Sequence, residues 1–392
     1  MLRWAPAEIS AHQGTNWYMV TNSRRVHARP NRMDRILAEA TPTSSNGEER
    51  VGTKRTKVLR GARQKNGILV DLSRTQPYEA ATIPLGVLDG RFCLSPERVQ
   101  QLLQEHALTE DQLLTLLITS ASKLARPPIS SFHVGAVGLG ASGALYVGVN
   151  LEFARLPLYN SVHAEQFLVV NALHHGEKGI QKLAISAAPC GHCRQFYSEL
   201  ACAETVKFSF QGGTYTLGQL LPLRFKPADL LPDPSTPLLL DQQNNRIVFT
   251  PEAQEIIKSL PTNSSLADAA DAALEEARRS YAPYSHCPAG IAIVTQEEGP
   301  RVYSGGYIES AAYNPSMPPL QTAIIDAVID GMPCYTGISD VVLVELRGGP
   351  VQHAPTTKVI LEQIAPQARL MVLQADWEEG EAPDGTNGGT LS

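Results

Sequence analysis

The sequence contains no uninterrupted apolar segment close to the roughly 18–20 residues that a membrane-spanning helix needs. It also has few cysteines for its length, six in 392 residues, which excludes a disulfide-rich scaffold. Two of the six, Cys190 and Cys193, are close together in the sequence. A reducing compartment would keep this pair free as metal-binding thiolates. These features predict a cytosolic protein with no membrane partner.

The sequence has no excess of positive charge either, since its formal net charge is −6. Proteins that bind a nucleic acid backbone neutralise its phosphates with Lys and Arg, so this balance argues against a nucleic acid partner. A small-molecule substrate fits it better. Hydrophobic residues make up 43% of the chain, which is enough for ordinary packed cores. The length suggests two or three domains of about 100–200 residues each.

The two ends of the chain differ in composition from the rest. The first 33 residues contain five arginines, no lysine and one acidic residue, Glu8, and a basic stretch rich in Ser and Gly follows. We interpret residues 1–90 and the acidic, glycine-rich residues 376–392 as disordered. An Arg-rich, acid-poor beginning is also typical of an organelle transit peptide. This alternative would place the protein in an organelle.

Residues 95–230 are predicted to form a layered α/β domain. A capping residue followed by proline at Ser95-Pro96, and a capping box that begins at Thr109, predict two leading helices. Two strands joined by a turn, a buried helix from His163, a short strand and another helix come next. This alternation of strands and helices favours an α/β architecture. The proline-rich residues 222–237 are interpreted as a linker.

Residues 247–375 repeat the pattern of the first domain at an offset of about 155 residues. The matching segments are Pro128–Gly135 with Pro283–Gly290, Asn150–Glu152 with Tyr307–Glu309, and Ser161–Gln166 with Ser316–Gln321. Where the first copy has His163 and Glu165, the second has Pro318 and Leu320. No Cys-x-x-Cys follows the last matching strand of the second copy. We therefore predict a duplicated fold whose degenerate second copy has no zinc site.

The chemical signal of the chain is His163-Ala-Glu165, followed 24 residues later by Pro189-Cys190-Gly-His-Cys193. One His and two Cys are ligand types that zinc prefers, and a catalytic zinc site keeps its fourth position open for water. Cys190 and Cys193 are three residues apart at a predicted helix start, so both thiols point to one side. A structural zinc site usually has a fourth protein ligand, and His192 is sterically unsuited to that place. The pattern predicts catalytic zinc.

Glu165 is the predicted catalytic acid and base. Zinc lowers the pKa of its bound water from about 15.7 toward 7, which prepares a nucleophile. A deamination also needs a proton on the ring nitrogen and another on the leaving ammonia. Glu165 lies two residues past His163 at a helix start, where it can reach the water without binding the metal. It would move both protons, first as a base and then as an acid.

The His-x-Glu and Pro-Cys-x-x-Cys motifs together are the known signature of zinc deaminases. Over residues 95–375 the sequence resembles the cytidine deaminase family, in its larger two-domain, homodimeric type from some bacteria and plants. The resemblance rests on Ser131–Ala136, Val149–Phe153, Val162–Gln166, Pro189–Gln195 and the second-copy segment Asn314–Gln321. It implies a three-layer α/β/α fold, duplicated, with a homodimer as the assembly. Ala188 stands where the bacterial relatives have threonine.

The resemblance also implies a reaction and a set of substrate-binding residues. The reaction is hydrolytic deamination of cytidine and 2′-deoxycytidine to uridine and 2′-deoxyuridine, with attack of zinc-bound hydroxide at C4, in pyrimidine salvage. Phe132 would stack on the pyrimidine ring, and Asn150 and Glu152 would hydrogen-bond the ribose 3′-hydroxyl. The backbone of Ala164 would contact the base. Phe225 matches an aromatic residue that reaches the neighbouring subunit's site, although core packing is an equal alternative.

Three other functions are weighed against this one. A deaminase of polynucleotides needs a basic groove and stacking aromatics, but aromatic residues make up 6% of this chain. A deoxycytidylate deaminase needs a phosphate clamp, and neither a glycine loop nor an arginine cluster stands beside the motifs. A non-catalytic interaction module would have had no need of Glu165, which the degenerate copy has lost. A free nucleoside is therefore the predicted substrate.

Overall fold

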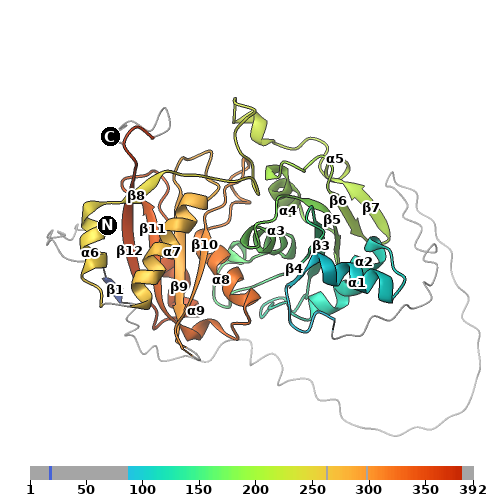
Figure 1. Cartoon of the computed structure of the whole chain (residues 1–392), viewed down its shortest axis with the longest axis horizontal. Coiled ribbons are helices and arrows are strands. Elements are labelled where there is room, and N and C mark those ends of the chain that lie inside the picture. The colour runs from blue at the N-terminus through green and yellow to red at the C-terminus, as the bar shows by residue number, and fades with distance from the viewer. Residues whose placement is uncertain (1–16, 20–86, 262–263, 297–298, 382–392) are drawn as a thin grey trace, which may run out of the picture. The chain divides into compact units, whose positions relative to one another are not determined.

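The structure is a computed structural model that describes residues 17–19, 87–261, 264–296 and 299–381. The described residues belong to one compact unit, which contains two six-stranded sheets, each covered by helices (Figure 1). None of the described helices combines the length and the apolar character that a membrane crossing requires. The α/β class predicted from the sequence is confirmed.

The first sheet holds the strands of the first copy in the order β2-β4-β3-β5-β6-β7. Its strands are β2 (Cys93–Leu94), β3 (Gly135–Gly140), β4 (Leu145–Val149), β5 (Ile180–Ile185), β6 (Lys207–Phe210) and β7 (Gly213–Thr216). Its helices are α1 (Pro96–Glu105), α2 (Glu110–Ser122), α3 (Ala164–His174), α4 (Gly191–Phe196) and α5 (Leu217–Leu220). All neighbouring strands are antiparallel except β5 and β6, which are parallel.

Glycines in β3 and β4 bring helices onto both faces of this sheet. A Cβ atom at Gly135 would lie 2.6 Å from the backbone nitrogen of Ser122 in α2. A Cβ atom at Gly148 would lie 2.0 Å from the carbonyl oxygen of Ala164, at the start of α3. Only glycine permits so close an approach of backbone to backbone. The first turn of α3, which carries the His-x-Glu motif, is thereby held directly against the sheet.

The local start signals read from the sequence are confirmed for the leading helices. The Ser95 hydroxyl accepts the backbone N–H of Arg98, and Pro96 occupies the first turn of α1. Thr109 and Gln112 form a complete capping box at the start of α2. These side chains satisfy backbone N–H groups that have no partner within the helix.

The second sheet has the order β1-β12-β11-β9-β10, with β8 also paired to β12. Its strands are β1 (Trp17–Met19), β8 (Ile247–Phe249), β9 (Ala289–Thr295), β10 (Arg301–Gly306), β11 (Ile338–Leu346) and β12 (Arg369–Trp377). Its helices are α6 (Pro251–Lys258), α7 (Ser265–Arg279), α8 (Pro319–Ile329) and α9 (Ala354–Ile364). The order β10-β9-β11-β12, with its last pair parallel, repeats the order β4-β3-β5-β6 of the first sheet. The duplication is confirmed at the level of topology.

The two copies also share individual hydrogen bonds. The Glu152 carboxylate accepts the backbone N–H groups of Ile129 and Ser130. In the second copy, the Glu309 carboxylate accepts the N–H groups of Tyr284 and Ser285, at the corresponding positions. The residues that follow, Ser131 and His286, both have a positive φ, of 55° and 53°. A duplication explains this detailed match, because chance resemblance does not reproduce backbone geometry.

At the positions of the predicted zinc ligands, the second copy has different side chains. Pro318 stands at the N-cap of α8, as His163 does for α3, and His353 stands at the N-cap of α9, as Cys190 does for α4. The ring of Tyr307 packs at 4.4 Å from that of buried His353. Burial lowers the pKa of His353 to about 4, so this ring is neutral near pH 7. Proline and a neutral, buried histidine thus stand at the helix starts where the first copy has His163 and Cys190.

Three boundaries differ from the sequence predictions. Trp17–Met19, inside the predicted extension 1–90, forms β1 and pairs with Arg369–Met371 of β12, because an edge strand offers free backbone groups. Order in the first copy begins before Ser95, since Leu88 and Phe92 are buried in its core. β12 runs to Trp377, into the predicted tail 376–392, because it pairs there with β8. Of the predicted extension 1–90, only residues 17–19 and 87–90 are among the described residues. The predicted disorder or transit peptide therefore lies outside the described residues.

A buried carboxylate joins the two copies. Glu199 lies in a 3-10 turn directly after α4 and is fully buried. Its oxygens accept the hydroxyls of Tyr281, Tyr284 and Ser310 and the backbone N–H of Ala311, all from the second copy. Four donors match the acceptor capacity of a carboxylate. Burial nevertheless raises the pKa of Glu199 above its usual value.

Replacement of Glu199 by leucine is expected to destabilise the fold, because it leaves four buried donors without an acceptor. Each such donor costs about 1–3 kcal/mol, so the free energy of unfolding should fall by several kcal/mol. Glu199→Gln is the matched control, since its amide oxygen can still accept the Ala311 N–H. Urea denaturation of the purified variants measures both. Equal midpoints for the two variants would contradict the assigned role.

Candidate metal centre

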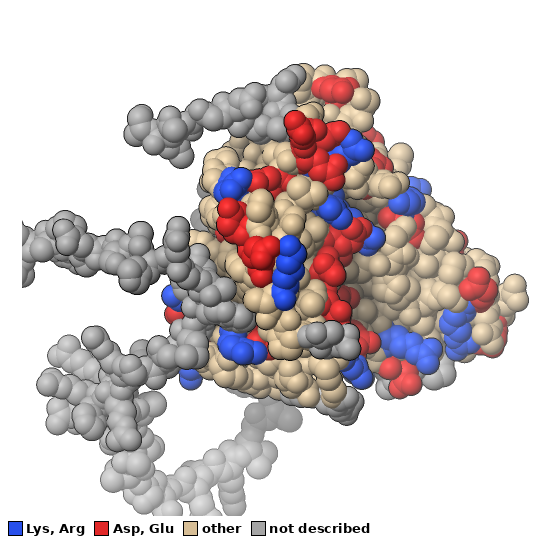
Figure 2. Space-filling model, turned by 60° about the vertical axis from the view of Figure 1, so that its left-hand side comes forward, with Lys and Arg blue, Asp and Glu red and all other residues tan. Residues whose placement is uncertain are grey.

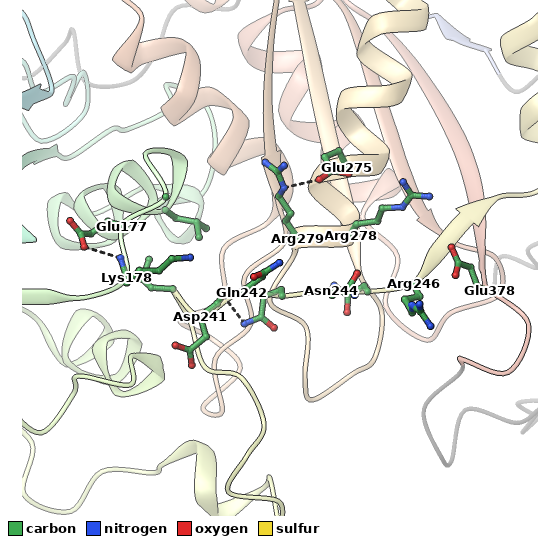
Figure 3. A pocket seen from close by; sticks show the side chains of 15 residues that line it. Glu177, Lys178, Asp241, Gln242, Asn244, Arg246, Glu275, Arg278, Arg279 and Glu378 are labelled. Carbon is green, nitrogen blue, oxygen red and sulfur yellow. Dashed lines mark hydrogen bonds and ion pairs between the residues drawn. The ribbon is translucent and has the colours of Figure 1, made fainter. Parts of the chain in front are cut away.

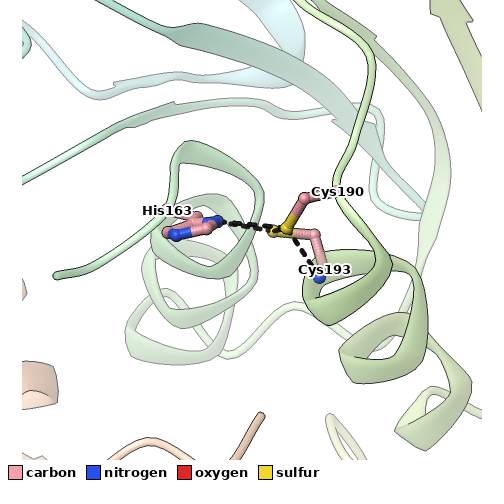
Figure 4. A group of neighbouring side chains, drawn as sticks. All are labelled: His163, Cys190 and Cys193. Carbon is pink, nitrogen blue, oxygen red and sulfur yellow. Dashed lines mark hydrogen bonds between the residues drawn. The ribbon is translucent and has the colours of Figure 1, made fainter. Parts of the chain in front are cut away.

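The three predicted zinc ligands lie at the starts of two helices. His163 is the N-cap residue of α3, and Cys190 is the N-cap residue of α4, with Cys193 in the first turn of that helix. An N-cap side chain lies over the first turn of its helix, and the Cys190 Sγ accordingly accepts the backbone N–H of Cys193 at 3.4 Å. Figure 4 shows the His163 ring and the two sulfur atoms pointing toward one another. The structure therefore brings together residues that are up to 30 positions apart.

The spacing of the donor atoms fits zinc. The Sγ atoms of Cys190 and Cys193 each lie 3.3 Å from Nδ1 of His163, and 3.6 Å from each other. A tetrahedral zinc ion, with Zn–S of about 2.3 Å and Zn–N of about 2.0–2.1 Å, places its ligand atoms about 3.5–3.8 Å apart. Within the described ranges, no fourth His, Cys, Asp or Glu joins this group. Three protein ligands with one open position are the arrangement of a catalytic site.

The two thiols are in different electrostatic environments. Hydrogen bonds from the Cys193 thiol and from His163 lower the pKa of Cys190 to about 3. Burial raises the pKa of Cys193, which is only 1% exposed. The hydrogen bond to Cys190 raises the pKa of His163 in turn. Metal ligands must be deprotonated, so zinc binding releases protons from this cluster.

Glu165 lies beside this cluster and is not part of it. Its side chain is buried, at 5% exposed, and its carboxyl group lies within hydrogen-bond reach of the Cys193 thiol. Burial raises the pKa of Glu165 above its usual value. A carboxyl group with a raised pKa can both take up and release a proton near neutral pH. The position and environment of Glu165 suit the proton transfer predicted for it.

The predicted ribose-binding residues lie at the end of β4, and both hydrogen-bond backbone groups. The Asn150 side chain accepts the Val134 N–H and donates to the Phe132 carbonyl. Glu152 accepts two backbone N–H groups and the Ser130 hydroxyl, which leaves one of about four acceptor sites free. Burial tends to raise the pKa of Glu152, but these hydrogen bonds outweigh it and lower the pKa. The carboxylate is therefore ionised at neutral pH.

The other predicted substrate contacts differ in exposure. Ala164 is fully buried, and its carbonyl faces Gly148, so its backbone N–H is the group that remains for a ligand. The Phe132 side chain is 60% exposed and the Phe225 side chain is 44% exposed. Core packing, the alternative considered for Phe225, does not agree with this exposure. An exposed aromatic ring is free to contact a ligand or another chain.

Sequence reasoning did not single out Gln166 or Glu199. Gln166 lies in the first turn of α3, is 2% exposed, and accepts the backbone N–H of His163. The sequence signal that could have found Gln166 is its place three residues after the N-cap His163, where Gln or Glu often caps a helix. Glu199 follows the apolar pair Phe196-Tyr197, and a lone acid in an apolar stretch was the only hint of its burial.

A cavity of about 660 Å³ lies away from the metal centre (Figure 3). It is bordered by the segment Leu240–Arg246 and by residues near the end of α3 and in α7. None of the predicted site residues lines it. Its charges are mixed, and Arg279 pairs with Glu275 at 2.8 Å. A cavity with opposed, paired charges offers no site for the predicted chemistry.

Comparison with known proteins agrees with this geometry. The family described as the zinc-binding region of cytidine and deoxycytidylate deaminases matches the chain twice, over residues 108–209 and 217–358. Cytidine deaminase 1 from Arabidopsis thaliana is 41% identical over 296 residues, which are 72% of this chain and 96% of that protein. Cytidine deaminase 6 from the same plant is 41% identical over 66% of this chain and 90% of its own length. Cytidine deaminase from Vibrio atlanticus is 37% identical over 71% of this chain and 88% of that protein.

The second family match covers the second copy, whose described residues form no group of side chains that could hold a metal ion. Within the described residues, the His163, Cys190 and Cys193 group is the one cluster of such side chains that could hold a metal ion. The first copy therefore has the one candidate zinc site among the described residues. With this site, the repeated fold and relatives that match over most of both chains, the chain belongs to the zinc-binding cytidine and deoxycytidylate deaminase family.

Proposed function

We propose that this chain is a cytidine deaminase, a hydrolase that converts cytidine and 2′-deoxycytidine to uridine and 2′-deoxyuridine with release of ammonia. The observation that carries the proposal is the three-donor group of His163, Cys190 and Cys193 with the buried Glu165 carboxyl beside it. A structural zinc site would need neither the open position nor a carboxyl that can exchange protons. These products would be those of an enzyme of pyrimidine salvage.

His163, Cys190 and Cys193 would hold the zinc ion in this reaction. When bound, zinc supplies a water that is acidic enough to act as a nucleophile at neutral pH. Glu165 takes up the proton that this water gives away and passes it to the ring nitrogen N3 as C4 is attacked. It would then take the second proton from the new hydroxyl on C4 and deliver it to the amino group, which leaves as ammonia. One water is consumed, one C–N bond breaks, and one C–O bond forms.

The end of β4 would select the sugar. The Glu152 carboxylate is ionised and has an acceptor site free for the ribose 3′-hydroxyl. Asn150 holds the segment from Phe132 to Val134 and would add its own contact to the same hydroxyl. Phe132 is exposed enough to stack on the pyrimidine ring, and the Ala164 N–H would contact the base.

A panel of substrates tests the proposed function. Purified protein should deaminate cytidine and deoxycytidine, while 3′-deoxycytidine should show a kcat/KM about 10–150-fold lower. This range follows because a hydrogen bond to a charged group contributes about 1.5–3 kcal/mol. Absorbance of the pyrimidine ring follows the reaction, with 5′-deoxycytidine as the control for loss of a different hydroxyl. Equal rates on cytidine and the 3′-deoxy analogue would rule out the ribose assignment.

Deoxycytidylate and cytosine-containing oligonucleotides belong in the same panel as the alternative substrates. On the face drawn in Figure 2, acidic and basic side chains are interspersed, without an extended basic track. A contact between Glu152 and a free 3′-hydroxyl also disfavours a polymer, whose 3′-oxygen is esterified. If the protein deaminates deoxycytidylate or the oligonucleotide faster than cytidine, the proposed nucleoside substrate is wrong.

A homodimer is proposed as the active assembly. Several large apolar side chains are exposed in the single chain, namely Leu158 at 65%, Tyr159 at 84% and Leu223 at 97%, besides Phe132 and Phe225. Leu158 and Tyr159 are adjacent in the sequence, and adjoining exposed apolar groups favour contact with another chain. Phe225 would reach the site of the second subunit. All six cysteines are free, which supports a reducing compartment such as the cytosol.

A further inference from the structure

One loop of the second copy contacts both helices that carry the zinc ligands. This loop, Ser310–Ser316, leads into α8 and is called the 310–316 loop below. The side-chain amide of Gln166 donates to the Pro315 carbonyl at 3.1 Å. The oxygen of the same amide accepts the backbone N–H of His163 at 3.3 Å. A single buried side chain therefore links the first zinc ligand to the second copy.

The loop makes its second contact with His192, which lies between the two predicted cysteine ligands in the sequence. Nε2 of His192 lies 2.8 Å from the Asn314 carbonyl oxygen, so this nitrogen carries the proton and donates. The His192 ring lies 5.6 Å from the His163 ring, between centroids. Because His192 is flanked by Cys190-Gly191 and Cys193, holding its ring restrains the turn that presents both thiols.

The 310–316 loop is itself held firmly. The buried Glu199 carboxylate accepts the Ser310 hydroxyl at 3.0 Å and the Ala311 N–H at 2.8 Å. At the other end of the loop, the Ser316 hydroxyl accepts the Ser310 N–H at 3.0 Å. Glu199 belongs to the turn that directly follows α4. The loop thus binds the turn that follows α4 through Glu199, and the first turn of α4 through His192.

We propose that the 310–316 loop positions the zinc ligands of the first copy, with Gln166 and His192 as positioning residues. The proposal rests on the ligand set of the proposed function. His163 belongs to one helix start, and the two cysteines to another. Neighbouring carbonyls of one fixed loop, Asn314 and Pro315, hold both starts at the spacing that zinc needs. The second copy would thereby support zinc binding in the first copy, although it is predicted to bind no zinc itself.

Zinc release tests this proposal without relying on turnover. Gln166→Met keeps the length of the side chain and removes both hydrogen bonds. Mutation of a residue that hydrogen-bonds a metal ligand typically lowers metal affinity about 10–100-fold. Zinc transfer from Gln166→Met to a chromogenic chelator should therefore be faster by about that factor. Gln321→Met is the matched control, because Gln321 occupies the same helical position in α8 and is equally buried, at 4% exposed. Its release rate should equal that of the unchanged protein.

A second pair of variants separates positioning from packing. His192→Leu removes the donor to Asn314, whereas His192→Gln places an amide donor at about the same reach. Zinc release should accelerate about tenfold or more in the leucine variant and return toward the original rate in the glutamine variant. His192 is only half-buried, so this pair carries the test if Gln166→Met fails to fold.

The outcomes distinguish the two proposals. If the unchanged protein holds no zinc, or if Cys193→Ala holds it as tightly, the ligand assignment itself fails. If zinc is bound through these ligands but Gln166→Met or the leucine variant releases it within about twofold of the unchanged rate, the positioning role is overturned. Equal rates for His192→Leu and His192→Gln overturn it as well.

Discussion

Replacement of Glu165 by glutamine is expected to abolish most turnover of cytidine while zinc stays bound. The amide has the size of the carboxyl group but can neither take a proton from water nor give one to the leaving ammonia. General acid–base catalysis contributes about 10²–10⁴-fold for one positioned group. Because Glu165 serves both proton transfers, kcat should fall by at least this range. Steady-state kinetics on cytidine measures the loss.

Zinc content is the internal control for Glu165→Gln. Glu165 lies beside the His163, Cys190 and Cys193 group but is not one of its three donors, so elemental analysis should show as much zinc as in the unchanged protein. Cytidine should also still bind, since the predicted sugar contacts lie at the end of β4. If Glu165→Gln keeps its full zinc content and an activity within about tenfold of the original, the proton-transfer role of Glu165 is wrong.

Cys193→Ala is expected to give a protein that purifies without zinc and without activity. Cys193 is 1% exposed and its Sγ lies 3.3 Å from Nδ1 of His163, and among the described residues the donor group has only His163 and Cys190 besides it. Loss of one of three protein ligands leaves only two, which is too few for a catalytic zinc site. Zinc per chain is measured by elemental analysis.

Cys287→Ala is the matched control for this variant. Cys287 is also buried, at 2% exposed, but lies in the second copy next to β9. Its replacement should leave zinc content and turnover unchanged. A chelator should lower the thermal midpoint of unfolding for this control and for the unchanged protein, because zinc binds only the folded state. The same shift in Cys193→Ala, or full zinc in it, would refute ligation by Cys193.

The zinc ligands and the duplication could be predicted from sequence because each depends on local patterns. His163, Glu165, Cys190 and Cys193 belong to two short motifs, and each motif begins a helix, where backbone geometry largely decides where side chains point. The helix starts at Ser95 and Thr109 were predictable for the same reason, since capping involves residues only a few positions apart.

The contacts between the copies could not be predicted in this way. Glu199 meets four donors that are 82 to 112 residues away in sequence, and Gln166 meets Pro315 from a distance of 149 residues. β1 pairs with a strand about 350 residues further along the chain. No local pattern specifies such a partner, because the partner is decided by how the two sheets and their helices pack.

The sequence by itself therefore determined the family and the metal, and it predicted three ligands for that metal, all in one copy. Only the tertiary structure decided which groups of the other copy contact the helices of the candidate metal centre. In that copy the rings of Tyr307 and His353 pack against each other, and its 310–316 loop hydrogen-bonds Gln166 and His192 of the first copy. The physical reason is that ligand chemistry is carried by residue type and short spacing, whereas support for the ligands comes from backbone carbonyls, which every residue has and which only folding brings into place.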